Sequence, residues 1–465
     1  MPNLSTAATT PAVRTPGLRR LQISLLAVTM LTAIDQTIVA TALPTIVGDV
    51  GGRAAMGWVF AGYTLAMTAA MPIYGRLGDL RGRRQAFLGC LVGFVAASAL
   101  CGIASSMTQL ILLRAVQGLA GGGVLVLSQA VVADAVPARE RGRFMAPVGL
   151  VFAASSVLGP LVGGLLTESV GWRWIFWVNV PLGAVAISMA YRSVPHPTGP
   201  RATGRLDVPG AVLYVLAVTG LVLLTGTLGG DAALAPAVVL SGAGATTVVW
   251  VLFVARMLRH DDPLIPVGVV RNRSVVIACC LGLVIGGALF ALVGYIPTIM
   301  QAVLGMRPAS SGALLLSLVL GMMVSTTTSG HWTARTGHYR RLPLLGSLVS
   351  AGALGWLSTL DSSWSPARTG VALFALGLGA GCFMMLVVTI AQDAVTQAEV
   401  GSATSTVNLV RELGVTIGAA SIGGVLAVEV ASVVPTLFIT LASVFAAGAA
   451  LSLLLPDKPL SARAG

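Results

Sequence analysis

Long apolar runs follow one another through almost the whole of this sequence, and charged residues fall mainly between the runs. Only 9% of the residues are charged, whereas soluble globular domains carry about 25%. A helix needs about 20 apolar residues to cross a bilayer, so the chain is long enough for many crossings. The sequence therefore predicts an all-α integral membrane protein surrounded by lipid.

Apolar runs separated by charged or turn-rich segments predict fourteen spanning helices, and an even number places both termini on one side. With the N-terminus inside, most of the 28 Arg and Lys residues fall in cytoplasmic segments, as basic loops of membrane proteins do. The predicted spans are residues 21–44, 55–75, 85–106, 108–134, 144–167, 174–192, 209–229, 236–257, 274–299, 309–330, 342–360, 367–391, 402–428 and 433–455.

The formal net charge of +12 is also a property of proteins that bind nucleic acid. Because basic cytoplasmic loops account for the charge, we expect no nucleic-acid partner. The five cysteines lie in apolar runs without metal-ligand spacing, and we interpret them as packing residues. The first 20 residues are polar and predict a cytoplasmic tail. No cleavage site follows the first apolar run, which we interpret as a permanent helix.

Two short segments of the sequence resemble each other. "GRLGDLRGRR" begins at Gly75 and "GHWTARTGHYRR" begins at Gly330, and each follows a predicted span. Both place two glycines seven residues apart before a pair of arginines, although Ala334 stands where the first copy has Asp79. Repeated halves are typical of transporters.

Few charged residues fall inside the predicted spans. Asp35 and Arg114 are both roughly 21 Å above the cytoplasmic face at about 1.5 Å per residue, so we expect them to pair. Protonation of Asp35 would then release the arginine, which is the functional interpretation; the alternative is a static salt bridge. Glu412 is either a second proton or cation site or a local partner of Arg411, and the sequence does not decide between them.

Two further groups of residues are candidates for function. The segment "VLGPLVGG" allows close helix packing, a bend that seals the cavity, or both, through Gly159, Pro160, Gly163 and Gly164. Aromatic and amide side chains in or near the spans form a candidate pocket for a flat apolar ligand, although each aromatic residue alone is more often a lipid-facing or interfacial anchor. These residues are Gln36, Trp58, Tyr63, Phe290, Tyr295, Gln301, Phe383 and Asn408.

Several of these segments together resemble the major facilitator superfamily, in particular its fourteen-span drug:proton antiporter branch. "GRLGDLRGRR" resembles the superfamily's loop between the second and third spans, and "LLRAVQGLAGGG" its fourth-span arginine motif, with Arg114 in the arginine position. "VLGPLVGG" resembles the fifth-span antiporter motif, and "AIDQTIVATALP" the first-span acidic motif. "WRWIFWVNVP" and "YIPTIMQAVLG" are similar to segments of the same branch, but Ala40 stands where many relatives carry Asn.

The resemblance implies two six-helix bundles, residues 21–192 and 274–455, around a central cavity. Residues 193–273 would form a linker with two extra spans, 209–229 and 236–257, and residues 1–20 and 456–465 would be cytoplasmic tails. Asp35 would be the proton-coupling carboxylate, modulated by Arg114. The loop of Gly75, Asp79, Arg81, Gly82, Arg83 and Arg84 would be a conformational latch.

The resemblance also implies export of amphipathic, often cationic, compounds by alternating access, in exchange for protons. The energy source would be the proton gradient, with no bound cofactor or metal. We expect a monomer in the inner membrane of a bacterium. One alternative on the same fold is a dedicated exporter of a single metabolite, self-made antibiotic or lipid. A membrane-embedded enzyme is disfavoured because HExxH and GxSxG are absent. Buried charges and the repeat disfavour a receptor that does not transport.

Overall fold

The computed structural model describes residues 15–52, 55–196, 202, 204–228, 236–426, 430–456 and 458–461. The first half consists of α1 (Thr15–Val50), α2 (Trp58–Arg81), α3 (Arg83–Cys101), α4 (Met107–Ala135), α5 (Ala138–Ser169), α6 (Trp174–Trp177) and α7 (Asn179–Ser193). A hairpin of α8 (Val208–Leu228) and α9 (Pro236–Arg259) follows. The second half consists of α10 (Val267–Arg271), α11 (Arg273–Val284), the π-helix Ile285–Phe290, α12 (Ala291–Val293), α13 (Ile296–Leu304), α14 (Pro308–Thr336), α15 (Arg341–Leu357), α16 (Pro366–Gly381), α17 (Met384–Asp393), the 3₁₀ turn Gln397–Glu399, α18 (Val400–Leu426) and α19 (Val430–Ser452).

Helices lie in every stretch that the sequence predicts to span the membrane. Within the described residues, eleven are long and apolar enough to cross a bilayer. Helices α2, α5 and α15 occupy the other three predicted stretches without meeting that criterion, and α15 has only 17 residues. The structure is therefore that of a multi-pass membrane protein, and the count of fourteen spans stays a prediction.

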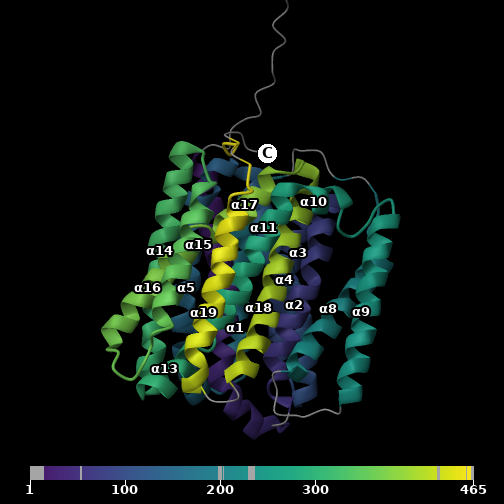
Figure 1. Ribbon diagram of the computed structural model, residues 1–465. Helices are drawn as coiled ribbons and strands as arrows, with labels where there is room; N and C mark the ends of the chain where they lie inside the picture. Colours follow the sequence, from purple (N-terminus) through teal and green to yellow (C-terminus); the bar gives the residue numbers. More distant parts are fainter. Residues whose placement is uncertain are drawn as a thin grey trace, which may run out of the picture.

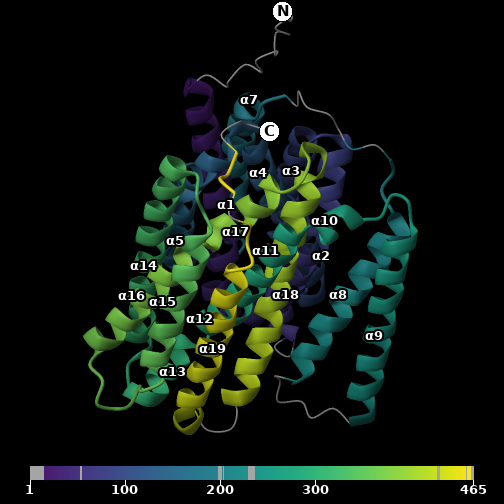
Figure 2. The same ribbon diagram turned by 45° about the horizontal axis from the view of Figure 1, so that its top comes forward.

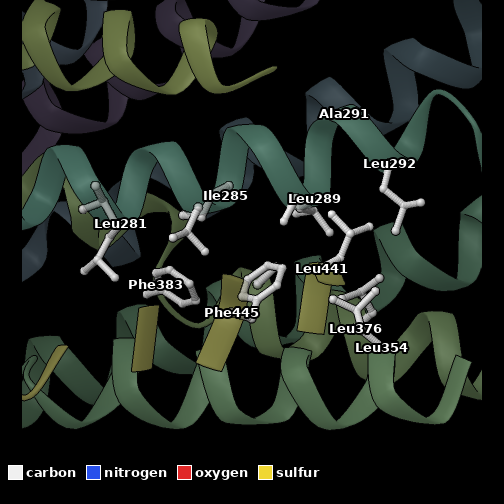
Figure 3. Close-up of a cluster of buried hydrophobic side chains, with 14 of the residues drawn as sticks. Leu281, Ile285, Leu289, Ala291, Leu292, Leu354, Leu376, Phe383, Leu441 and Phe445 are labelled. Carbon is white, nitrogen blue, oxygen red and sulfur yellow. The ribbon is translucent and has the colours of Figure 1, made fainter. Parts of the chain in front are cut away.

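The long helices run side by side in one bundle, with α8 and α9 at its edge (Figure 1). Apolar side chains of α1 to α7 form two buried clusters, and those of α11 to α19 form a third. In the third cluster Leu281, Ile285 and Leu289 face Phe383 and Phe445 (Figure 3). Each half therefore buries an apolar core of its own.

The hairpin packs over the seam between the halves. The hydroxyl of Tyr214 on α8 donates to the Thr68 carbonyl on α2 at 3.1 Å. Tyr214 belongs to a further buried apolar cluster that includes Leu409 of α18, and Leu65 of α2 packs against this cluster. Helix α8 thus contacts one helix of each half.

An ion pair at the base of the hairpin joins α8 to α9. Asp207 accepts Arg256 Nη2 at 2.7 Å and the Gly210 amide at 3.0 Å. Burial disfavours the charge of Asp207, but the hydrogen bonds from Arg256 and Gly210 outweigh it and hold the pKa of Asp207 below its usual value. The pair therefore favours the closed hairpin whenever Asp207 is ionised.

Three predicted spans are interrupted in the structure, namely 174–192, 274–299 and, between α16 and α17, 367–391. Pro181 has no N–H to donate to the carbonyl four residues earlier, which explains the break between α6 and α7 next to Val178. The chain after α11 widens into the π-helix, where Gly286 and Gly287 let α18 approach closely. Such π-bulges are frequent at functional sites.

Both ends of the described chain lie at one end of the bundle (Figure 2). This end also carries the α2–α3, α4–α5 and α14–α15 connections, and we name it the arginine-rich end. Helix α1 begins at Thr15, so residues 15–20 of the predicted polar tail are helical; residues 1–14 lie outside the described ranges. The Arg139 amide donates to the Ser461 carbonyl at 3.2 Å, which places the C-terminal residues against α5.

Candidate functional site

A buried ion pair joins α1 to α4. Arg114 Nη1 donates to Asp35 Oδ2 at 2.7 Å, and the two side chains are 1% and 0% exposed. The other carboxylate oxygen, Oδ1, accepts Gln117 Nε2 at 2.9 Å and Asn179 Nδ2 at 2.8 Å. The pairing expected from the two helix depths is confirmed, and every partner donates to the carboxylate.

The helices around the pair fix its geometry. Gln117 lies one turn after Arg114 on α4 and accepts from Arg114 Nη1 at 2.7 Å, so one helix presents both donors. The guanidinium lies 4.3 Å from the ring centroid of Tyr63 on α2. Such stacking lowers the cost of burying the cation. A desolvated pair is costly to break by removing one partner, at about 3–5 kcal/mol.

Glu412 lies outside this cluster. It pairs with its neighbour Arg411 at 2.9 Å on α18, and the side chains of Arg411 and Glu412 are 16% and 15% exposed. Residues 401, 405, 408 and 412 share one helical face, and Gly401 and Ser405 approach α2 on that face. The local pair with Arg411 is present, and Glu412 also lies on the side of α18 that faces the first half.

The last turns of α2 close the arginine-rich end. The predicted loop from Gly75 to Arg84 is wrong, because α2 runs to Arg81 and α3 begins at Arg83, which leaves only Gly82 between them. Asp79 accepts the amides of Gly401 and Ser402 at 2.9 and 2.8 Å, and the Ser402 hydroxyl at 2.9 Å. Both amides lie in the first turn of α18, where the helix dipole favours a negative charge. Gly75 is required beside them, because a Cβ there would overlap Ser405 and the Gly401 carbonyl. Asp79 thus joins the first half to the second.

The neighbouring arginines act in different places. Arg83 donates to Asp79 at 2.9 Å and contacts Asp134 and the Gln397 carbonyl. Arg84 instead donates to the carbonyls at the end of α7, those of Tyr191 at 2.7 Å and residue 194 at 3.0 Å. Arg81 is exposed, and Gly82 ends α2 with φ of 102°, a value that favours glycine.

The second copy of the repeat forms the corresponding seam between α14 and α5. A Cβ at Gly330 would overlap the backbone of Gly142 and Arg143, and one at Gly142 would lie 3.1 Å from the Gly330 Cα. Arg139 Nε donates to the Ala334 carbonyl at 2.8 Å. The degenerate copy therefore supplies a backbone acceptor where the first copy supplies the Asp79 carboxylate.

An amide network lies deeper in the seam. Asn408 on α18 is fully buried and donates to Gln129 Oε1 on α4 at 2.7 Å. Gln392 on α17 accepts from Arg141 Nη1 at 3.1 Å and donates to the Thr404 hydroxyl at 2.9 Å. Asn408 is thus a bridge between the halves in this conformation.

The glycine segment of α5 packs on α1. A Cβ at Gly159 would overlap Thr37, and one at Gly163 would overlap Thr41 and the Ile38 carbonyl. No atom lies within 4 Å of a Cβ added at Gly164, and the side chain of Pro160 lies outside the described residues. Close packing is therefore present, and α5 is a continuous helix through this segment.

The other predicted pocket residues are scattered. Trp58 is exposed at the start of α2, and Phe383 is fully buried in the apolar cluster of the second half (Figure 3). The Tyr295 hydroxyl donates to the Ala419 carbonyl at 3.0 Å, and Gln301 donates to the Ser311 hydroxyl at 3.1 Å. Gln36 and Phe290 are half-buried, and Tyr63 stacks on Arg114.

At the end of α1 remote from the arginine-rich end, Asp49 accepts Trp172 Nε1 at 2.9 Å and Arg173 Nη1 at 2.8 Å. These bonds hold the pKa of Asp49 below its usual value. Within the described ranges, His, Cys, Asp and Glu side chains form no group of three that would bind a metal ion.

Gln117 and Asn179 contact Asp35 but are not among the site residues that the sequence predicts. Both lie within quoted motifs, "LLRAVQG" and "WRWIFWVNVP", and both are polar residues in predicted spans. That placement was the available signal, because a polar side chain in a bilayer needs a partner.

Comparisons with known proteins agree with one another. A family model described as Major Facilitator Superfamily matches residues 25–419. The chain is 33% identical over 401 residues to Multidrug resistance protein 3 of Bacillus subtilis, covering 85% of this chain and 77% of the relative. It is 31% identical over 396 residues to the multidrug transporter protein MdtP of the same organism, covering 85% and 72%.

Another relative, an uncharacterized MFS-type transporter of Mycobacterium tuberculosis, is 33% identical over 394 residues, which cover 85% of this chain but 57% of the relative. The chain therefore spans little more than half the length of that protein. Among solved structures, the human organic anion transporter MFSD10 superposes with a TM-score of 0.68 at 16% identity, covering 94% of this chain and 99% of that one. The proton:xylose symporter XylE superposes with a TM-score of 0.65 at 12% identity, covering 96% and 98%.

Proposed function

Because this chain belongs to the Major Facilitator Superfamily, we propose that it is a proton-coupled antiporter that exports amphipathic, often cationic, compounds by alternating access. The family and its all-helical fold are those of transporters rather than enzymes. Relatives named as multidrug transporters support export of drug-like compounds. The proton gradient supplies the energy, with no cofactor.

The observation that carries the proposal is the burial of Asp35 with Arg114 inside the first half. Charged side chains at membrane depth are expensive and mark ion pathways by default. Protonation removes the charge of Asp35 and with it most of its attraction for Arg114. One proton moving inward across 100 mV releases about 2.3 kcal/mol, which supports about 50-fold accumulation of a neutral substrate since 1.4 kcal/mol is tenfold.

Alternating access needs the seam at the arginine-rich end to open and close. Opening breaks the bonds from Gly401 and Ser402 to Asp79 and the bond from Asn408 to Gln129. It thereby uncovers Asn408 on the face of α18 that also carries Glu412. We assign this face, with Gln36 and Tyr63 of the first half, to substrate or cation binding.

The proposed topology has fourteen spans with both termini in the cytoplasm, and the arginine-rich end faces the cytoplasm. Residues 21–192 and 274–455 form the two moving bundles, and α8 and α9 belong to the linker 193–273. The protein works as a monomer in the inner membrane of a bacterium. The gathering of arginines at one end supports this orientation.

Ethidium efflux from cells tests the function. We compare the wild type, Asp35→Asn and the control Asp49→Asn, which removes an exposed carboxylate from the same helix, each with and without a protonophore. The proposal is supported if the wild type and Asp49→Asn export ethidium, if the protonophore stops this export, and if Asp35→Asn exports none at equal expression. Full efflux by Asp35→Asn would assign Asp35 a structural role. A wild type that moves no amphipathic cation would favour a dedicated exporter.

A further inference from the structure

The carboxylate of Asp35 has a full set of donors and no acceptor. Arg114 occupies Oδ2, and Gln117 and Asn179 occupy Oδ1. This arrangement suits the ionised form, because a carboxylate only accepts. A protonated carboxyl also carries an O–H, and a buried O–H without an acceptor is costly. The side chain of Asp35 is 0% exposed, so the acceptor has to come from the protein.

Neither donor on α4 has a free acceptor. Arg114 has none by its chemistry. The amide oxygen of Gln117 already accepts from Arg114 at 2.7 Å, so turning this amide would break that bond. The other titratable groups that face Asp35 are Tyr63 on α2 and Cys101 on α3, and neither makes a hydrogen bond to it.

Asn179 on α7 is different. Its Nδ2 donates to Asp35 at 2.8 Å and to the Ser98 hydroxyl at 3.0 Å, whereas its Oδ1 is buried without a partner. A half-turn of the amide exchanges the two atoms and presents Oδ1 to Asp35. One end of the amide stays without a partner in either orientation. The Ser98 hydroxyl donates to the Phe176 carbonyl at 3.0 Å, so it would have to leave that carbonyl to donate to the turned amide.

We propose that Asn179 is a positioning residue for the proton site, which donates to ionised Asp35 and, after its amide turns, accepts a hydrogen bond from protonated Asp35. The proton sits on Oδ1, which keeps the bond from Gln117, while Oδ2 keeps the bond from Arg114. The proposal rests on the assignment of Asp35 as the proton carrier, and it gives the proton a partner inside the first half.

A double-mutant cycle at two pH values tests this role without any transport measurement. Infrared spectra of the wild type and Asp35→Asn are compared over a range of pH. A protonated-carboxyl band that only the wild type shows belongs to Asp35, and the pH range over which it appears is the range in which Asp35 titrates. Thermal unfolding of purified full-length wild type, Asn179→Leu, Asp35→Leu and the double variant is then measured above and below that range. Leucine has the same branching and number of heavy atoms as asparagine and is not smaller, so no cavity is left.

We expect Asn179→Leu to lower the unfolding temperature by about 1–2 °C more in the wild type than in Asp35→Leu, at both pH values. Coupling only above the titration range would make Asn179 a fixed donor and overturn the proposal. If Asn179 and Asp35 are coupled at neither pH, the proposal is also overturned, and Asn179 serves only in the packing of α7.

If Asp35→Leu does not fold because Arg114 is left unpaired, the cycle uses Asp35→Leu/Arg114→Leu, since apolar replacement of a whole buried pair is often tolerated. Absence of any titrating Asp35 band, by contrast, removes the proton site itself, and with it both the proposed function and this role.

Discussion

Replacing Asp79 by Asn should open the arginine-rich end. Asp79 accepts two amides of α18, the Ser402 hydroxyl and Arg83, all at 2.8–2.9 Å. The substitution removes a negative charge at a helix N-terminus, which contributes up to about 2 kcal/mol. The asparagine side chain also places an N–H group where the carboxylate oxygen accepted bonds from N–H and O–H groups. Each hydrogen bond to a charged acceptor contributes about 1.5–3 kcal/mol. A loss of about 2–4 kcal/mol shifts the ratio of open to closed molecules roughly 30- to 1,000-fold.

Spin labels on the two halves measure that ratio. Glu140 on α5 and His338 after α14 are exposed at the arginine-rich end, and cysteines there carry the labels in a background without the five native cysteines. Asp79→Asn should transfer most of the distance distribution from the short to the long distance. The exposed Arg81 provides the control, and Arg81→Gln should leave the distribution unchanged. A wild-type distribution for folded Asp79→Asn would refute the latch.

Three further predictions concern local structure. Gly82→Ala should lower stability by about 1–2 kcal/mol, because φ of 102° is strained for alanine; thermal unfolding measures it. The wild type should lose its stability advantage over Asp207→Asn as the pH falls below about 4, near the usual pKa of an aspartate. The pKa of Asp207 is lowered, so the pair with Arg256 stabilises the protein only while Asp207 is ionised. Unfolding scans at pH 3 and 7 check the sign. Tyr214→Phe removes the hydroxyl that donates to the Thr68 carbonyl and should weaken the packing of α8 on α2. A loss of about 1.4 kcal/mol would make proteolysis of the hairpin about tenfold faster. An unchanged rate would assign the attachment to apolar packing alone.

Helix depth was enough to predict the Asp35–Arg114 pair. Apolar runs define where helices cross the bilayer, and 1.5 Å per residue then gives each charge a height. Two opposite charges at one height have few other partners in lipid. The resemblance implies a latch only at the first copy of the repeat, around Gly75. That Gly330 also lies where two helices touch does not follow from the sequence.

Rotation about each helix axis is what the sequence does not show. Height alone gives no direction, so neither Asn179 beside Asp35 nor Phe383 in an apolar core follows from span positions. Contacts between segments far apart in the chain are equally hidden. The bond from Asn408 to Gln129 and the position of Tyr214 over the seam depend on how the two halves dock.

The most direct test of proton coupling is proton movement itself. The wild type, Asp35→Asn and the control Asp49→Asn are reconstituted into vesicles that contain a pH-sensitive dye, and an ethidium gradient is imposed without any pH gradient. We predict that ethidium flux drives proton flux in the opposite direction in the wild type and Asp49→Asn, and that Asp35→Asn moves no protons. Ethidium transport by the wild type without any change of pH would contradict the account.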